Sequence, residues 1–111
     1  MNQSDLFAEI ISTYRKHGWS LRRVLARAEM QAELAAQMAA SGESANIAEA
    51  PVDAMWFARP SQEGREAWEL RLVAEAPYAL FETFEADEAE EDREEVRREM
   101  EARLREHLAR V

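Results

Sequence analysis

Residues 52–58 read Val-Asp-Ala-Met-Trp-Phe-Ala, and this stretch decides the fold class. In an extended chain, successive side chains point to opposite faces. The even-numbered positions then place four apolar side chains on one face, while Met55 and Phe57 stand on the other. Because both faces are apolar, the pattern predicts a strand that is covered on both sides.

Two further strands are expected after this one. Residues 67–74 alternate, with Trp68, Leu70 and Leu72 on the inward face, and residues 79–84 supply a shorter apolar segment. The turn-rich stretch at 60–64 separates the first two strands, and Pro77 marks a second tight connection. Such short connections predict a three-stranded antiparallel meander.

Helical spacing dominates the chain before residue 42. Apolar residues recur at intervals of three and four from Leu6 to Tyr14, with Ser4 as the expected N-cap and Gly18 as the stop. Residues 19–27 partly fit a strand, but Arg23 would then stand on its apolar face. We therefore expect a second helix over 21–40 and a connecting loop over 41–50.

The last element is a long, charged helix. Asp87 and Glu90 have the spacing of a capping box, and acidic residues precede arginines as the helix dipole favours. Val96, Met100 and Leu104 form a narrow apolar stripe. The expected fold class is therefore α+β, a single domain over 1–111. It has two N-terminal helices, a three-stranded antiparallel meander and a long C-terminal helix packed on the sheet.

Charge and composition narrow the functional classes. The 111-residue chain has a formal net charge of −9, which disfavours nucleic acid and anionic membranes as general partners. Residues 1–40 carry four acidic and five basic side chains, whereas residues 41–111 carry nineteen acidic and nine basic ones. The chain has no cysteine, no signal-peptide pattern and no long apolar run, so we expect a cytoplasmic protein without a membrane span.

Few residues have the spacing that catalysis or cofactor binding requires. His17 and His107 lack a second ligand at metal-binding spacing, and the acidic run over 82–95 lacks a calcium-loop pattern. There is no nucleophile elbow and no phosphate-binding glycine loop. The sequence therefore predicts no metal and no cofactor. It disfavours an enzyme without deciding the question, because carboxylates that pair only in space stay possible.

Residues 14–27 resemble a helix-turn-helix. Gly18 would lie in the turn, Ser20 would cap the second helix, and Val24 would pack between the helices. This resemblance implies a DNA-binding regulator whose arginines contact phosphates. A helix–glycine–helix corner without any DNA role has the same pattern.

We expect a non-catalytic interaction or regulatory module that binds a protein partner or forms a homodimer. Its basic segment would attract the acidic helix at 87–95 of another copy. The residues assigned to this partner-binding patch are Arg15, Lys16, Trp19, Arg22, Arg23 and Arg27. Two alternatives remain: the DNA-binding regulator using 14–27, and a small-ligand protein or enzyme with a pocket on a partly open, aromatic sheet face.

Overall fold

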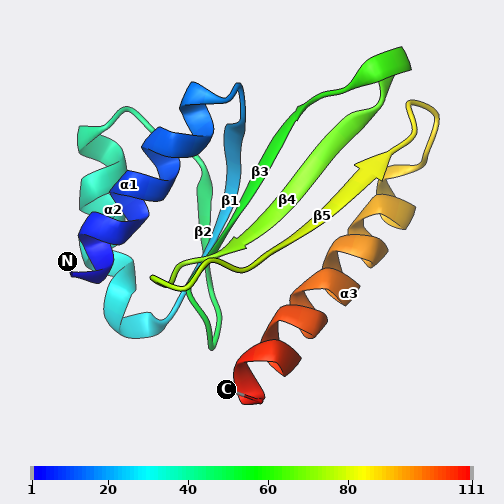
Figure 1. The fold of residues 1–111 in the computed structure, drawn as a ribbon. Helices are drawn as coiled ribbons and strands as arrows, with labels where there is room; N and C mark the ends of the chain where they lie inside the picture. The colour runs from blue at the N-terminus through cyan, green and yellow to red at the C-terminus, as the bar shows by residue number, and fades with distance from the viewer. Residues whose placement is uncertain (1, 111) are drawn as a thin grey trace.

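The computed structural model describes residues 2–110, which form an α+β fold with a five-stranded mixed sheet (Figure 1). The elements in chain order are α1 (Gln3–Lys16), β1 (Ser20–Ala26), α2 (Gln31–Ala40), β2 (Asn46–Glu49), β3 (Ala54–Pro60), β4 (Glu66–Leu72), β5 (Ala79–Phe84) and α3 (Glu90–Ala109). Single 3₁₀ turns at Ala28–Met30 and Gln62–Gly64 lie before α2 and between β3 and β4. No helix within 2–110 is both long and apolar enough to cross a membrane.

The sheet has the strand order β2-β1-β3-β4-β5. Strands β3, β4 and β5 form the expected antiparallel meander, and β1 pairs antiparallel with β3. The short β2 lies parallel to β1, and α2 lies in the connection between them, as a parallel pair requires. The two sheet edges are therefore β2 and β5.

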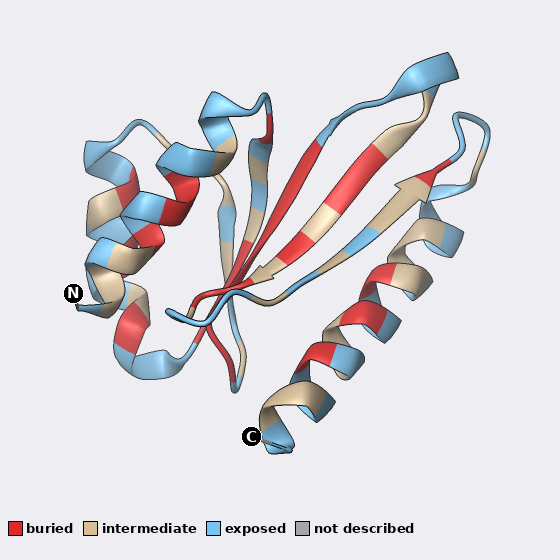
Figure 2. Cartoon of the chain, in the orientation of Figure 1, coloured by how far each residue is buried: buried red, intermediate tan, exposed pale blue. Residues whose placement is uncertain are grey.

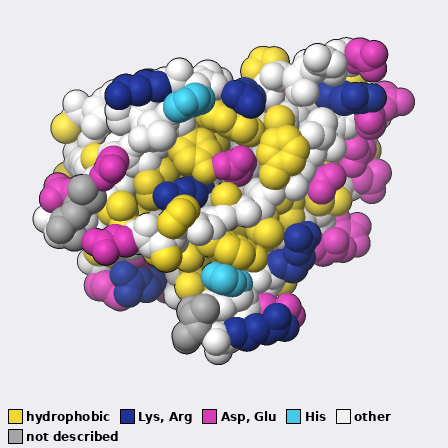
Figure 3. Space-filling model, in the orientation of Figure 1, with side chains coloured by type: hydrophobic (Ala, Val, Ile, Leu, Met, Phe, Trp, Pro, Cys, Tyr) yellow, Lys and Arg dark blue, Asp and Glu magenta, His cyan; other side chains and the backbone are white. Residues whose placement is uncertain are grey.

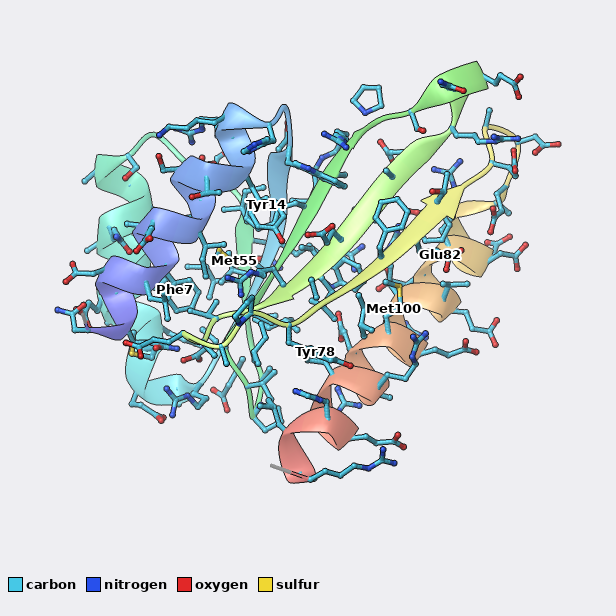
Figure 4. All side chains as sticks on the ribbon, viewed as in Figure 1. Phe7, Tyr14, Met55, Tyr78, Glu82 and Met100 are labelled. Atoms are coloured by element: carbon cyan, nitrogen blue, oxygen red, sulfur yellow. The ribbon has the colours of Figure 1, made fainter. Side chains whose placement is uncertain are left out.

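Helices cover both faces of the sheet, so the expectation for residues 52–58 is confirmed. Helices α1 and α2 pack on one face, where Met55 and Phe57 are buried, and we call this the α1–α2 face. Helix α3 packs on the opposite face, the α3 face, where Trp56 lies among Met100 and Leu104. Figure 4 shows Phe7, Tyr14 and Met55 on the first side and Met100 on the second.

The prediction of a single helix over 21–40 is wrong. Residues 20–26 form the strand β1, and helix α2 begins only at Gln31. The expected loop at 41–50 also contains β2, so the sheet has five strands instead of three. The physical reason is burial on two sides: Val24 and Ala26 pack into the α1–α2 core while Leu25 packs into the α3 core. A helix cannot present three consecutive residues to two opposite cores.

Two expected helix starts are also corrected. Asn2, and not Ser4, caps α1 by accepting a hydrogen bond from the backbone N–H of Asp5 at 2.8 Å. The Ser4 hydroxyl instead donates to Gln37 of α2, joining the two helices. Helix α3 begins at Glu90 with Ala89 as its N-cap, so the capping box expected from Asp87 and Glu90 does not form. In the preceding turn, the Glu88 carboxylate accepts from the backbone N–H of Glu85.

Candidate functional site

The six residues predicted to form one partner-binding patch lie in different places. Arg15 is ion-paired with Glu43 at the end of α1, and Lys16 beside it is exposed. Arg22 and Arg23 point to the α3 face, whereas Trp19 belongs to the α1–α2 core. Arg27 lies at the opposite end of β1 and is treated below. The structure therefore does not bring these side chains into a common surface.

A β-bulge places Arg22 and Arg23 on the same face of the sheet. The pairing of β1 with β3 shifts by one residue between Leu21 and Arg23. Such a shift leaves an extra residue in the strand, so two consecutive side chains can point the same way. Both guanidinium groups accordingly lie within 6 Å of the ring of Trp68.

The two arginines line a hollow of about 500 Å³ between β1, β4 and the start of α3. Its wall continues into Arg97, which is 1% exposed and whose Cζ lies 4.3 Å from the ring centroid of Trp68. Arg97 donates to Glu90 at 2.6 Å and to Glu94 at 2.9 Å, while its Nη1 atom has no hydrogen-bond partner among residues 2–110.

Charges around the hollow are neutralised within the chain. Arg23 lies 2.8 Å from Glu94, and Arg22 lies 3.4 Å from Glu66. Burial alone would raise the pKa of Glu94, but hydrogen bonds from Arg97 and Arg23 outweigh it and hold that pKa below its usual value. The attraction expected between the basic segment and the acidic helix of another copy thus already operates inside one molecule.

Arg27 and Asp53 form a structural joint at the far end of β1. Asp53 is 4% exposed and accepts hydrogen bonds from the backbone N–H of Arg27 at 2.9 Å and from its Nη2 at 2.8 Å. Gln3 of α1 donates to the same carboxylate at 3.0 Å. Although burial opposes ionisation, these donors lower the pKa of Asp53. The joint connects α1, β1 and the segment before β3.

Trp19 belongs to a cluster of aromatic rings on the α1–α2 face. Tyr14 stacks on Phe57 with ring centroids 4.1 Å apart, and Trp19 meets Tyr14 edge-to-face at 6.1 Å. The Tyr14 hydroxyl donates to Glu69 of β4. Burial, followed by this hydrogen bond, raises the pKa of Tyr14 well above its ordinary value.

These residues surround a notch of about 200 Å³, which we call the aromatic notch. Its lining consists of Thr13, Tyr14, His17, Trp19 and Glu69. Within residues 2–110, Glu69 has no ion-pair partner within 4 Å. The notch therefore combines aromatic side chains with a half-buried carboxylate whose one hydrogen-bond donor, in the part of the chain that the structure describes, is the Tyr14 hydroxyl.

Beside the notch, the α1–α2 face is partly open over β4 and β5, although Ala67 of β4 is buried there. Helix α1 packs against β1 and α2 against β2, whereas α3 packs against β4 and β5 from the other side. Phe81 of β5 lies directly across from Glu69 and is 58% exposed. We call this area, from the aromatic notch across Arg71 to Phe81, the open half of the sheet. Figure 3 shows hydrophobic side chains gathered on this side of the molecule, with charged groups among them.

Sequence reasoning missed Tyr14 and Glu69 as site residues. Tyr14 is spaced as a core residue of α1, and Glu69 looks like any charged residue on the outer face of a strand. Phe81 falls within the aromatic cluster that suggested a partly open sheet face. Trp19, which the sequence analysis assigns to a partner-binding patch, also lines this notch, so the sequence holds two signals for the site.

The histidines do not form a metal site in the described part of the chain. The Nδ1 atom of His17 lies 2.9 Å from the backbone carbonyl of Thr13, and His107 stacks on Tyr78 at 3.7 Å. No group of three histidine or acidic side chains within 2–110 has the geometry to hold a metal ion.

No protein-family model, curated protein or solved structure matches this chain. The interpretation of the site therefore depends on its geometry and chemistry.

Proposed function

We propose that this protein is an interaction module that binds a protein partner on the open half of its sheet. The observation that supports this is Phe81. It is the one large hydrophobic side chain that is mostly exposed in the described residues, and it lies on the face that α1 and α2 leave open. A single exposed apolar residue is ordinary, but one that continues an aromatic notch forms a larger contact surface.

The composition of this surface favours a protein contact. Tyr, Trp and Arg are the residues most enriched at interface hot spots, and Tyr14, Trp19, Arg59 and Arg71 supply them here. Arg59 lies over the ring of Trp19 at 4.4 Å and donates to the carbonyl of His17, which holds both side chains in place. Side chains ordered before binding lose little conformational entropy when a partner arrives.

The volume of the aromatic notch favours a protein partner over a small-molecule ligand. Small-molecule sites usually enclose about 300–1,000 Å³, whereas the aromatic notch measures about 200 Å³. It can accept one side chain of a partner while Phe81 contacts its neighbours. The hollow beside Trp68 is larger, but its arginines are engaged by carboxylates, and a ligand would have to displace those ion pairs.

The DNA-binding alternative loses the geometry on which it depended. A recognition helix was expected after Gly18, but residues 20–26 form a strand inside the sheet. Arg22 and Arg23 are paired with Glu66 and Glu94. No described element presents them on a helix that could enter the major groove.

A photo-crosslinking experiment tests the proposed function. A benzophenone amino acid is placed at Thr13, which lines the aromatic notch, or as a matched control at Ala36, which is exposed on α2. Irradiation in cells of the source organism should give a reproducible protein adduct from position 13 and none from position 36. Equal labelling from both positions, or none from position 13, would contradict the proposal.

A further inference from the structure

The edge strand β5 has a row of backbone groups that no described strand satisfies. Leu72 donates its N–H to the carbonyl of Tyr78 at 3.0 Å, and the register of β4 and β5 continues without a shift to Phe84. In an antiparallel ladder, hydrogen-bonded and non-hydrogen-bonded pairs alternate. The even-numbered residues of β5 therefore bond to β4, and the odd-numbered residues Ala79, Phe81 and Thr83 direct their N–H and C=O groups outward.

This edge lacks the features that usually prevent strand pairing. Natural edge strands carry prolines, lysines or bulges, or are very short. Residues 79–84 read Ala-Leu-Phe-Glu-Thr-Phe, with no proline, no lysine and no bulge. The only charge, Glu82, pairs with Trp68 and so points to the α3 face.

We propose that two copies of this chain pair through β5, antiparallel, about a two-fold axis that passes by Phe81. This inference uses the same exposed Phe81 as the proposed function, so the dimer would cover that edge of the open half of the sheet and leave the aromatic notch to the partner. In this register Phe81 faces Phe81 of the second copy, and Ala79 faces Thr83 on each side. All three outward-facing residues then exchange both backbone hydrogen bonds with the other copy, giving a continuous ten-stranded sheet.

The side chains of β5 fit the register centred on Phe81 better than a register centred on Ala79 or Thr83. The two Phe81 rings, each 58% exposed in one copy, meet across the axis as an aromatic cross-strand pair. On the α3 face, Glu82 lies opposite Leu80 instead of opposite the other Glu82. Centring the axis on Ala79 would place Pro77, which has no N–H, opposite Phe81. Centring it on Thr83 would place Glu85 opposite Phe81.

The same axis places the two α3 helices on one face of the joined sheet. Neighbouring strands lie about 4.8 Å apart. Helix α3 packs on β4 and β5, and its Glu94 and Glu101 also reach Arg23 of β1 and Trp56 of β3, so its axis lies at least one strand spacing from the two-fold axis. The two helices then lie on either side of the strand ladder, at least about 10 Å apart.

Charges on the paired helices are complementary. Helix α3 runs antiparallel to β5, since Arg93 lies over Phe84 at one end and His107 stacks on Tyr78 at the other. A two-fold axis places the first half of one α3 beside the second half of the other. Residues 90–99 hold six acidic and three basic side chains, whereas residues 100–110 hold two acidic and three basic ones. The acidic half of each copy thus faces the weakly basic half of its neighbour.

Disulfide trapping tests both the dimer and its register, because the chain contains no cysteine of its own. In the proposed register, the Cα atoms of two Phe81→Cys residues lie about 5.5 Å apart, within reach of a disulfide. Two Thr83→Cys residues lie about 14 Å apart and serve as the matched control. Mild oxidation should convert Phe81→Cys to dimer at least tenfold faster than Thr83→Cys. A mixture of Ala79→Cys and Thr83→Cys chains should form mainly the mixed disulfide.

Sedimentation equilibrium of the unsubstituted chain completes the test. We expect a concentration-dependent dimer at about 0.15 M salt, where repulsion between the two acidic chains is screened. Thr83→Pro removes an outward N–H and no bond to β4, so it should give a monomer with an unchanged circular dichroism spectrum. A monomer at concentrations near 1 mM, or Thr83→Cys crosslinking as fast as Phe81→Cys, would overturn the proposal. Neither result would affect the crosslink expected from Thr13.

Discussion

Replacing Asp53 should cost more stability than any other single change of charge to amide in the chain. Asp53→Asn keeps the shape of the side chain but removes the charge that accepts from Arg27 and Gln3. Breaking one partner of a buried ion pair costs about 3–5 kcal/mol. Because the Arg27 side chain is 44% exposed and can be solvated, we expect the lower end, about 3 kcal/mol. For a chain of this size that lowers Tm by roughly 13 °C.

The pH dependence provides a second readout for Asp53. Its pKa is lowered in the folded protein, so the carboxylate contributes stability above its unfolded value of about 3.9, and this is lost as pH falls through the folded pKa. Urea unfolding of Asp53→Asn should therefore lack part of the acid destabilisation of the parent chain. Asp87→Asn, at an exposed position, is the matched control. Equal stability of the two variants at neutral pH would refute the reasoning.

Three further predictions concern α1 and the two cores. Gly18→Ala should destabilise by about 1–2 kcal/mol in thermal unfolding, because φ is +82° there and a new Cβ meets no atom within 4 Å, so backbone strain alone contributes. Leu104→Ala, in the α3 core, should cost about 2–5 kcal/mol and the half-buried Leu108→Ala clearly less; similar losses would contradict the packing. Burial and the hydrogen bond to Glu69 raise the pKa of Tyr14, so stability falls as pH rises above about 10, the unfolded value. Tyr14→Phe should remove that part of the alkaline loss in urea titrations, and an unchanged pH profile would argue against it.

Much of the fold can be predicted from the spacing of apolar residues, in segments where either the helical or the strand period alone describes that spacing. Residues 52–58 predict a strand with two covered faces, and β3 is buried from Ala54 to Ala58, as Figure 2 shows along the centre of the sheet. The stripe at Met100 and Leu104 correctly predicts the buried side of α3. In these segments, local pattern and tertiary burial agree.

Strand β1 is not predicted from the sequence, because its bulge interrupts the alternation of side chains between the two faces of the sheet. With Arg22 as an extra residue, Leu21 and Arg23 no longer share a face, so the objection that Arg23 spoils an apolar face does not apply. Arg23 is also accommodated by Trp68 and Glu94, which are distant in sequence. A bulge and its partners depend on the neighbouring strand, and no single-chain periodicity reveals them.

The candidate site could be predicted only in outline. The aromatic cluster indicated an open sheet face, and Phe81 lies on one. The six residues of the basic segment do not share one surface, because side chains that are close in sequence lie on different faces and at different ends of β1. Glu69 becomes notable only through Tyr14, 55 positions away.

The position of β1 in the sheet also has a consequence for synthesis on the ribosome. Strand β1 lies between β2 and β3, although both of its partners follow it in the chain. Until residue 60 has emerged, β1 has no antiparallel neighbour, and the apolar stripe of α1 has no completed sheet to cover. The apolar side chains of the first fifty residues therefore stay exposed until the strands that follow them in the chain have been synthesised. This order predicts that the nascent chain becomes protease-resistant in one late step after β4, instead of gradually from its N-terminus.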